Sequence, residues 1–276
     1  MVAGLAFLAT AVATLFAEAT FKRWRQGRRP HEAAWTVALA LFALASAALA
    51  TGASTGWDRG VFRVFYLLGA VLNVPWLALG TVYLLFGEQA GRRVRAVLVF
   101  ASGLAVGVLL TAPFKGTVAG STTIPVGKDV FGVFPRVLAG VGSGLGALVV
   151  FGGAAWSAVR FARAAGGHGA APRARPGSPA GGMGGVPPTK AAGAAKMQPG
   201  RMAAANALIA LGTLVLSGGG TLQGVLGHDE AFTLSLASGI AVIYAGFLVA
   251  ARPAPATAVE SPSSRGVAAS PVGSQV

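Results

Sequence analysis

The chain contains no cysteine and has few acidic residues. Its 276 residues include 22 Lys and Arg but only 8 Asp and Glu, so the formal net charge is +14. The absence of cysteine excludes disulfides, thiolate metal sites and cysteine nucleophiles. No HExxH or GxSxG motif occurs either, so nothing in the sequence supports a zinc protease of the HExxH type or a hydrolase built on a nucleophile elbow.

Titratable residues are also missing from the long apolar stretches. These stretches contain no His for axial haem ligation, and the last of them has no Lys for a retinal Schiff base. The one cluster of ligand-type residues, His228 to Glu230, consists of neighbours whose side chains point apart in a turn, and we interpret it as a solvated turn. We therefore expect no enzymatic activity and assign no catalytic, cofactor-binding or metal-binding residue, because catalysis needs positioned acid–base or metal groups.

The chain is instead rich in long segments without charge. Hydrophobic residues make up 54% of it and charged residues 11%, well below the roughly 25% of a soluble domain. A helix of about 20 residues crosses the roughly 30 Å hydrocarbon core of a bilayer. The apolar stretches without Asp, Glu, Lys, Arg or His are residues 2–17, 33–57, 64–87, 96–114, 137–159, 202–227 and 231–251. They predict an all-α fold, a polytopic transmembrane helix bundle with seven spans.

Composition divides this bundle into four segments. We expect transmembrane helices 1–5 within residues 1–159, which include an outer loop at 113–135, and helices 6 and 7 within residues 203–251. Residues 160–202 are a basic linker and residues 252–276 a tail. Both have too few large apolar side chains to recover their ordering entropy by burial. We predict that both are disordered and lie in the cytoplasm.

Basic residues predict an orientation. Most Lys and Arg follow the first, third and fifth stretches or lie in the tail, and such residues are enriched on the cytoplasmic side. We expect an N-terminus outside, a cytoplasmic C-terminus and a location in the bacterial inner (plasma) membrane. The cluster from Lys22 to Arg29 follows the first stretch, whereas the charge of a signal peptide precedes it. The expected partners are the lipid bilayer with its anionic headgroups and other membrane proteins, not nucleic acid.

The third stretch carries Asn73 and Pro75 near its middle. Pro75 removes one intrahelical hydrogen bond and kinks the helix, and the freed carbonyl needs another donor. Two interpretations stay open. Asn73 either bonds across to a neighbouring helix within a packing kink, or it belongs to a binding site at mid-membrane.

The sixth stretch contains three consecutive glycines, Gly218–Gly220, between Ser217 and Thr221, with Gln223 shortly after. Such a run allows either close helix packing or a break in the helix. A break at this depth is tolerated only inside the protein or beside a cavity. Together with Asn73, the residues Ser217, Thr221 and Gln223 form the candidate polar site in the membrane.

Small-residue pairs and the loops give further expectations. Outer loop 113–135 is expected to form a small hairpin or re-entrant cap and an outer contact surface, with Trp57 as an interface anchor on the same side. Glu18 is expected to pair with Lys22 one turn later. Glycines four residues apart predict tight helix contacts. The pairs are Gly103/Gly107, Gly140/Gly144 and Gly142/Gly146.

Residues 62–80, FRVFYLLGAVLNVPWLALG, resemble a segment of uncharacterised actinobacterial multi-pass membrane proteins. The resemblance covers less than a tenth of the chain and implies no activity. The expected helix count and orientation are also similar to the seven-helix sensor region of some bacterial histidine kinases, although a tail stands here in place of a kinase domain.

These observations predict a non-enzymatic inner-membrane protein that acts as a sensor, scaffold or accessory subunit. The alternative is a small-solute transporter or channel. Its site would lie at mid-membrane, between the Asn73/Pro75 kink and a helix break at Gly218–Gly220 and Gln223.

Overall fold

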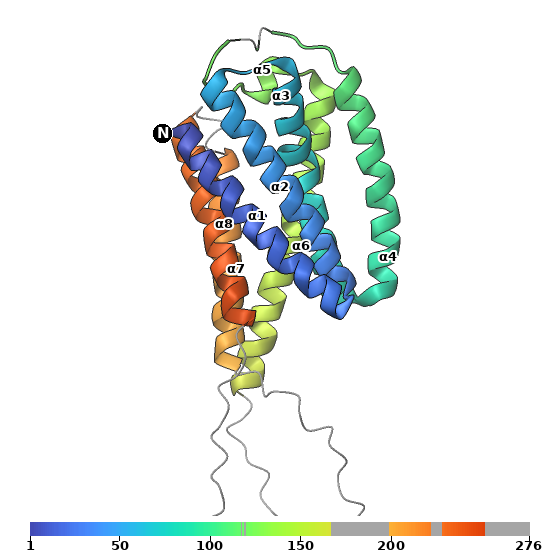
Figure 1. The fold of residues 1–276 in the computed structure, drawn as a ribbon. Coiled ribbons are helices and arrows are strands. Elements are labelled where there is room, and N and C mark those ends of the chain that lie inside the picture. Colours follow the sequence, from blue (N-terminus) through green and yellow to red (C-terminus); the bar gives the residue numbers. More distant parts are fainter. Residues whose placement is uncertain (117, 119, 167–198, 222–227, 252–276) are drawn as a thin grey trace, which may run out of the picture.

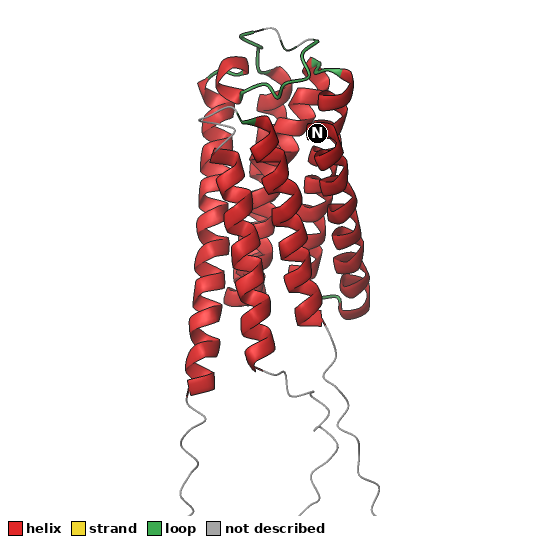
Figure 2. Ribbon diagram, turned by 90° about the vertical axis from the view of Figure 1, so that its left-hand side faces the viewer, coloured by secondary structure: helices red, strands yellow, loops and turns green. Residues whose placement is uncertain are grey.

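The protein is a bundle of helices. A computed structural model describes residues 1–116, 118, 120–166, 199–221 and 228–251. Helices run through nearly all of these residues and no strand occurs among them, apart from one isolated antiparallel bridge (Figures 1 and 2). The predicted all-α fold is therefore confirmed. The expected tail at 252–276 lies outside the described residues.

Two long helices form the first hairpin, α1 (Val2–Gly27) and α2 (Pro30–Thr55). Arg28 in the turn is left-handed, with φ at 51°, and donates its backbone N–H to the Trp24 carbonyl at 2.7 Å. This bond satisfies a carbonyl that the end of α1 would leave open. Pro30 stands at the start of α2, where its missing N–H removes no helical hydrogen bond.

The third apolar stretch becomes three consecutive segments. Asp58 caps α3 (Arg59–Phe65) because its side chain accepts two backbone N–H hydrogen bonds. A π-helix, η1 (Tyr66–Leu72), follows and leads into α4 (Asn73–Thr111).

α4 turns back on itself at Gly87. This residue has φ at 81° and ψ at −178°, a conformation that glycine adopts without steric cost. The chain reverses here, so α4 consists of a first arm, residues 73–86, and a second arm, residues 88–111 (Figure 1). Residues 88–95 separate the third and fourth apolar stretches in the sequence, but the helix resumes directly after the glycine.

The remaining elements are α5 (Gly127–Val130), α6 (Val133–Gly166), α7 (Pro199–Thr221) and α8 (Asp229–Ala251). The described residues within 112–132, called the cap here, include α5 and lie over the end of the bundle where the N-terminus is found (Figure 1). We call this the cap end. The opposite end carries the α1–α2 turn and the turn of α4, both rich in arginine, and is called the basic end.

Both ends of the predicted linker 160–202 are helical, which corrects its boundaries. α6 continues to Gly166 and α7 begins at Pro199. Alanine and arginine, which favour helix, dominate the extension of α6. The middle of that linker lies outside the described residues.

The helices form a closed ring around a common interior. α1 lies between α2 and α8, and α2 also contacts η1 and α4. η1 and α4 in turn contact α6. α6 packs on α7, and α7 packs on α8, which closes the ring. The second arm of α4 stands at the edge of this ring (Figure 1).

Five helical segments are long and apolar enough to cross a membrane: Val2–Gly27, Pro30–Thr55, Arg59–Thr111, Val133–Trp156 and Asp229–Val249. Residues Ala207–Gly220 of α7 form a shorter apolar helix. Large apolar side chains point outward, among them Phe100 and Leu148, which are 76% and 70% exposed. Such a surface suits lipid and supports association with a membrane.

Glycines on α6 bring its backbone against the first arm. A Cβ on Gly146 would lie 2.9–3.0 Å from atoms of Val74, and one on Gly142 would lie 3.2 Å from the Val71 carbonyl. The predicted contact of the Gly142/Gly146 pair is therefore confirmed. A Cβ on Gly140, by contrast, would meet nothing within 4 Å, and the same holds for Gly103, Gly107 and Gly144.

Replacing Gly146 by valine should destabilise the protein. The added side chain would overlap the backbone of Val74, and overpacking typically costs about 1–3 kcal/mol. Thermal unfolding in detergent measures the effect. Gly140→Val is the matched control on the same helix, and its unfolding free energy should change by less than about 0.5 kcal/mol. Equal stability of the two variants would contradict the packing described here.

Candidate functional site

The wall of the candidate site begins with the backbone beside Pro75. In η1 the hydrogen bonds follow an i to i+5 pattern, as in the bond from the Asn73 N–H to the Leu68 carbonyl. In that pattern residue 75 would serve the Ala70 carbonyl, but proline has no N–H. Ser143 of α6 fills this role, since its Oγ donates to the Ala70 carbonyl at 2.5 Å. The second donor that the sequence predicts for the freed carbonyl is therefore Ser143.

A cavity of about 480 Å³ lies inside the ring of helices, next to this repaired turn. Along α3, η1 and the first arm, its wall runs from Phe65 to Leu77, about 18 Å at roughly 1.5 Å per residue. Side chains from α2, α6, α7 and α8 complete the wall. Most of them are apolar, and among the described lining residues none is titratable. The polar lining residues are Ser46, Asn73, Ser143 and Thr213.

Two of these polar groups keep their hydrogen-bonding capacity for a bound molecule. Ser143 is committed to Ala70, and Thr213 Oγ1 donates to the Ile209 carbonyl at 2.7 Å. Within the described part of the chain, neither the Asn73 amide nor the Ser46 hydroxyl makes a hydrogen bond. An amide has two N–H donors and an acceptor oxygen. Asn73 can therefore either donate a hydrogen bond to a neutral polar group of a ligand or accept one from it.

The other residues of the predicted polar site are only partly placed. Ser217 and Thr221 lie on α7, while Gln223 lies outside the described residues. Of the two interpretations of Gly218–Gly220, the structure has close packing and not a break, because α7 is continuous through these glycines. Gly219 lets α7 approach α8 closely, since a Cβ there would overlap Ser235. Gly220 lines the cavity.

The cap closes the bundle over one end of the cavity. The Trp57 N–H donates to the Ser121 carbonyl at 2.9 Å, and the Gly120 N–H donates to the Trp57 carbonyl at 3.2 Å. The backbone N–H of Ile124 donates to the carboxylate of Asp229 on α8 at 2.8 Å. Asp229 therefore ties the cap to the bundle, which corrects the prediction of a merely solvated turn.

Aromatic side chains fill the space beneath the cap. Trp57 is 1% exposed and packs where Gly52 has no side chain, so it is a core residue and not the predicted interface anchor. Phe62 and Phe131 are fully buried beside it. The rings of Phe65 and Phe232, 6.5 Å apart, line the cavity on this side.

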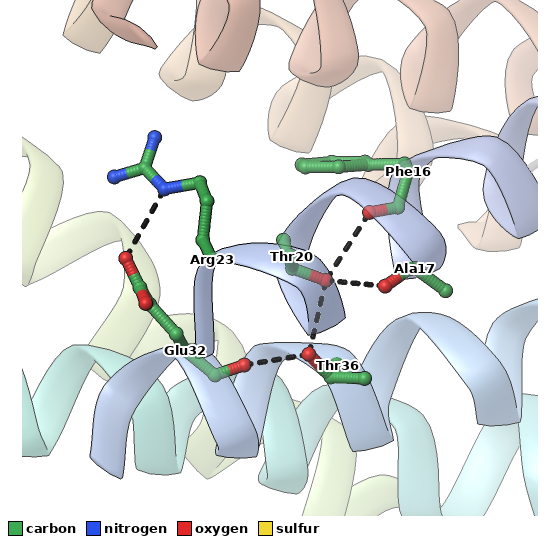
Figure 3. A network of polar contacts seen from close by, with 6 residues as sticks. All are labelled: Phe16, Ala17, Thr20, Arg23, Glu32 and Thr36. Atoms are coloured by element: carbon green, nitrogen blue, oxygen red, sulfur yellow. Dashed lines mark hydrogen bonds and ion pairs between the residues drawn. The ribbon is translucent and has the colours of Figure 1, made fainter. Parts of the chain in front are cut away.

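A buried ion pair lies at the basic end, between α1 and α2. Arg23 Nε donates to Glu32 Oε1 at 3.1 Å, and Glu32 is 3% exposed (Figure 3). The guanidinium of Arg23 also lies 4.9 Å from the ring centre of Phe247 on α8. The hydroxyls of Thr20 and Thr36, 3.1 Å apart, continue the contact between α1 and α2. These contacts fasten α1, α2 and α8 together below the cavity.

Sequence reasoning missed Glu32, Ser46 and Ser143. Glu32 is adjacent to the charged residues of the α1–α2 turn, so the sequence suggests that it is exposed. Ser46 and Ser143 are single hydroxyls among small residues. No periodic pattern of polarity along α2 or α6 marks either serine as interior. The predicted pair Glu18–Lys22 is confirmed at 2.6 Å, with both side chains more than half exposed.

Comparisons of the chain with protein-family models, curated proteins and solved structures find no match. The resemblance of residues 62–80 to actinobacterial membrane proteins stays a prediction. Within the described ranges, no group of three His, Asp or Glu residues could hold a metal ion.

Arg23→Gln should destabilise the protein more than the loss of an ordinary surface charge. It leaves the buried Glu32 carboxylate without its cation, and a broken buried pair costs about 3–5 kcal/mol. Because Arg23 is 39% exposed, we expect about 2–3 kcal/mol in thermal unfolding. Lys22→Gln breaks the exposed pair with Glu18 and should cost less than about 1 kcal/mol. A cost for Arg23→Gln no larger than for Lys22→Gln would show that Glu32 is solvated.

Proposed function

We propose that the protein crosses the bacterial inner membrane seven times, with its N-terminus outside and its C-terminus in the cytoplasm. Gly87 supports one further crossing beyond the five long segments, because it divides Arg59–Thr111 into two arms that run in opposite directions. α7 supplies the remaining crossing. The turns at the basic end carry most of the described arginines, which favours the cytoplasm for that side.

Cysteine labelling tests this topology, because the natural chain has no cysteine to remove. Ser121→Cys in the cap should react with an impermeant maleimide on intact cells. Gln26→Cys and Gln89→Cys, at the two basic turns, should react only after the membrane is opened. Labelling of Gln89→Cys on intact cells would contradict the hairpin of α4 in the membrane. The reverse pattern at Ser121 and Gln26 would invert the orientation.

The bundle is proposed to bind a small neutral molecule in the central cavity. Seven helical segments line the cavity, mainly with apolar side chains, and the amide of Asn73 makes no hydrogen bond to a described residue. A charged ligand would lose its hydration there without a countercharge from any described lining residue. A mostly apolar molecule with one or two hydrogen-bonding groups fits, because apolar pockets with few polar groups are typical of small-molecule sites.

The proposed role is that of a non-enzymatic sensor or accessory subunit. Asn73 and Ser46 supply hydrogen bonds, and acid–base catalysis would need a titratable group in reach of the ligand. The ligand would act on the packing of α2, α6, α7 and α8, whose side chains all line the cavity. Partner membrane proteins that bind the cap or the basic end would respond to that change in packing.

A carrier for the same molecule is the second candidate. The observation that favours it is the π-helix η1 in the cavity wall, because such irregular segments are common at moving helices of transporters. Measuring the flux of the bound molecule across a bilayer distinguishes a sensor from a carrier. Liposomes containing the purified protein should not accumulate the bound molecule if it is a sensor, whereas a carrier should equilibrate it across the bilayer.

Asn73→Leu and Ala147→Phe should both deplete the molecule that copurifies with the protein. Asn73→Leu removes the free amide, and Ala147→Phe fills the cavity from α6. Mass spectrometry of extracts from protein purified in mild detergent measures the bound molecule. We expect it to fall by about tenfold or more, since a lost buried hydrogen bond costs about 1–3 kcal/mol.

Leu148→Phe is the control for this experiment, since Leu148 adjoins Ala147 on α6 but is 70% exposed. It should retain the molecule at the level of the natural protein. If all three variants and the natural protein carry the same small molecules in the same amounts, the cavity is not a binding site.

A further inference from the structure

The second arm of α4 is fastened to the bundle at its two ends. Near Gly87, the ring of Tyr83 packs where Gly91 has no side chain. Near the cap, Ala105 and Leu109 are 3% and 0% exposed. Beyond them, Arg63 donates a hydrogen bond from its Nη2 to the Ala112 carbonyl at 2.8 Å.

Between these two ends the second arm contacts the first arm through Ser102 and Trp76, but a space remains beside this contact. This slot of about 320 Å³ lies between the second arm, the first arm and α6. Nearly all lining residues are apolar. Among the described ones Ser102 is the polar exception, and its hydroxyl is already engaged with the Leu98 carbonyl at 2.7 Å and with Trp76 Nε1 at 3.3 Å. The slot therefore offers an occupant no free hydrogen-bonding group, and an empty space of this kind would forfeit dispersion contacts on both walls.

The length of the slot matches one leaflet of a bilayer. On the second arm it runs from Val94 to Ala105, about 16 Å at roughly 1.5 Å per residue. Half of a roughly 30 Å hydrocarbon core has the same depth. The slot faces the lipid, since Val94 and Val97 in its wall are 40% and 69% exposed.

Cationic side chains stand at the mouth of the slot. Arg93 and Arg95 flank Val94, are exposed, and form no ion pair within the described part of the chain. Their neighbour Arg92 differs, because it pairs with Glu88 at 2.7 Å. An apolar slot one leaflet deep with two unpaired cations at its mouth complements a molecule that has an acyl chain below an anionic headgroup.

We propose that this slot binds an anionic diacyl phospholipid of the cytoplasmic leaflet. One acyl chain fills the space between the two arms of α4 and α6, and the phosphate contacts Arg93 and Arg95. The assignment of the leaflet rests on the orientation proposed above. The lipid would be a structural part of the bundle, because it fills the space that remains beside the contact between Trp76 and Ser102.

Native mass spectrometry of the full chain in a neutral detergent tests the proposal. The protein is titrated with dioleoyl phosphatidylglycerol and, separately, with dioleoyl phosphatidylcholine. Ala101→Phe fills the slot and should weaken retention of both lipids by at least about tenfold. Arg93→Gln with Arg95→Gln should weaken retention of the anionic lipid alone, by about 25-fold, since each arginine contributes roughly fivefold.

Each change has a matched control. Leu104→Phe adds the same ring on the exposed side of the second arm, and Arg25→Gln with Arg29→Gln removes two charges from the other basic turn. Both controls should retain the lipids as the natural protein does, and equal unfolding temperatures exclude misfolding. The proposal is overturned if Ala101→Phe behaves like Leu104→Phe, or if the two arginine pairs matter equally. None of these residues lines the central cavity, so such a failure leaves the proposed function standing.

Discussion

A backbone carbonyl inside a bilayer has no water with which to form a hydrogen bond. Because Pro75 has no N–H, one such carbonyl in this helix lacks its usual donor. The architecture around the cavity follows from this constraint. The helix widens into η1 before the proline, and Ser143 on α6 donates to the Ala70 carbonyl. Ser143 reaches that carbonyl because Gly142 and Gly146, on either side of it, let the two backbones approach. Proline, π-helix, serine and glycines therefore form one unit.

That unit fixes the distance between α6 and the first arm, and it leaves Asn73 facing the interior with its amide unbonded to any described residue. Both ends of the interior are held shut by polar contacts at the edge of the apolar region. The cap is tied to α2 and α8 through Trp57 and Asp229, and the basic end is tied through Arg23 and Glu32. The result is an interior space lined mainly by apolar side chains, with the Asn73 amide available to a polar group of a ligand.

Sequence reasoning recovered the apolar helices because length without charge is a direct consequence of the bilayer. It also identified Asn73 and the Gly142/Gly146 contact, since an amide, a proline and paired glycines stand out in an apolar background. It left Gly218–Gly220 open between a break and a close contact, because three glycines permit both, and the position of α8 decides for the contact. Glu32, Ser46 and Ser143 depend on which helix lies opposite, which no local pattern in one sequence reveals.

The central claim is that the interior beside Asn73 is an occupied binding space. The most direct measurement is an electron cryomicroscopy map of the full chain in lipid nanodiscs, prepared without added ligand. The account predicts non-protein density within hydrogen-bonding distance of the Asn73 amide, enclosed by α2, α6, α7 and α8. A map in which α2 and α6 close on each other, with Asn73 packed between their side chains, would contradict it.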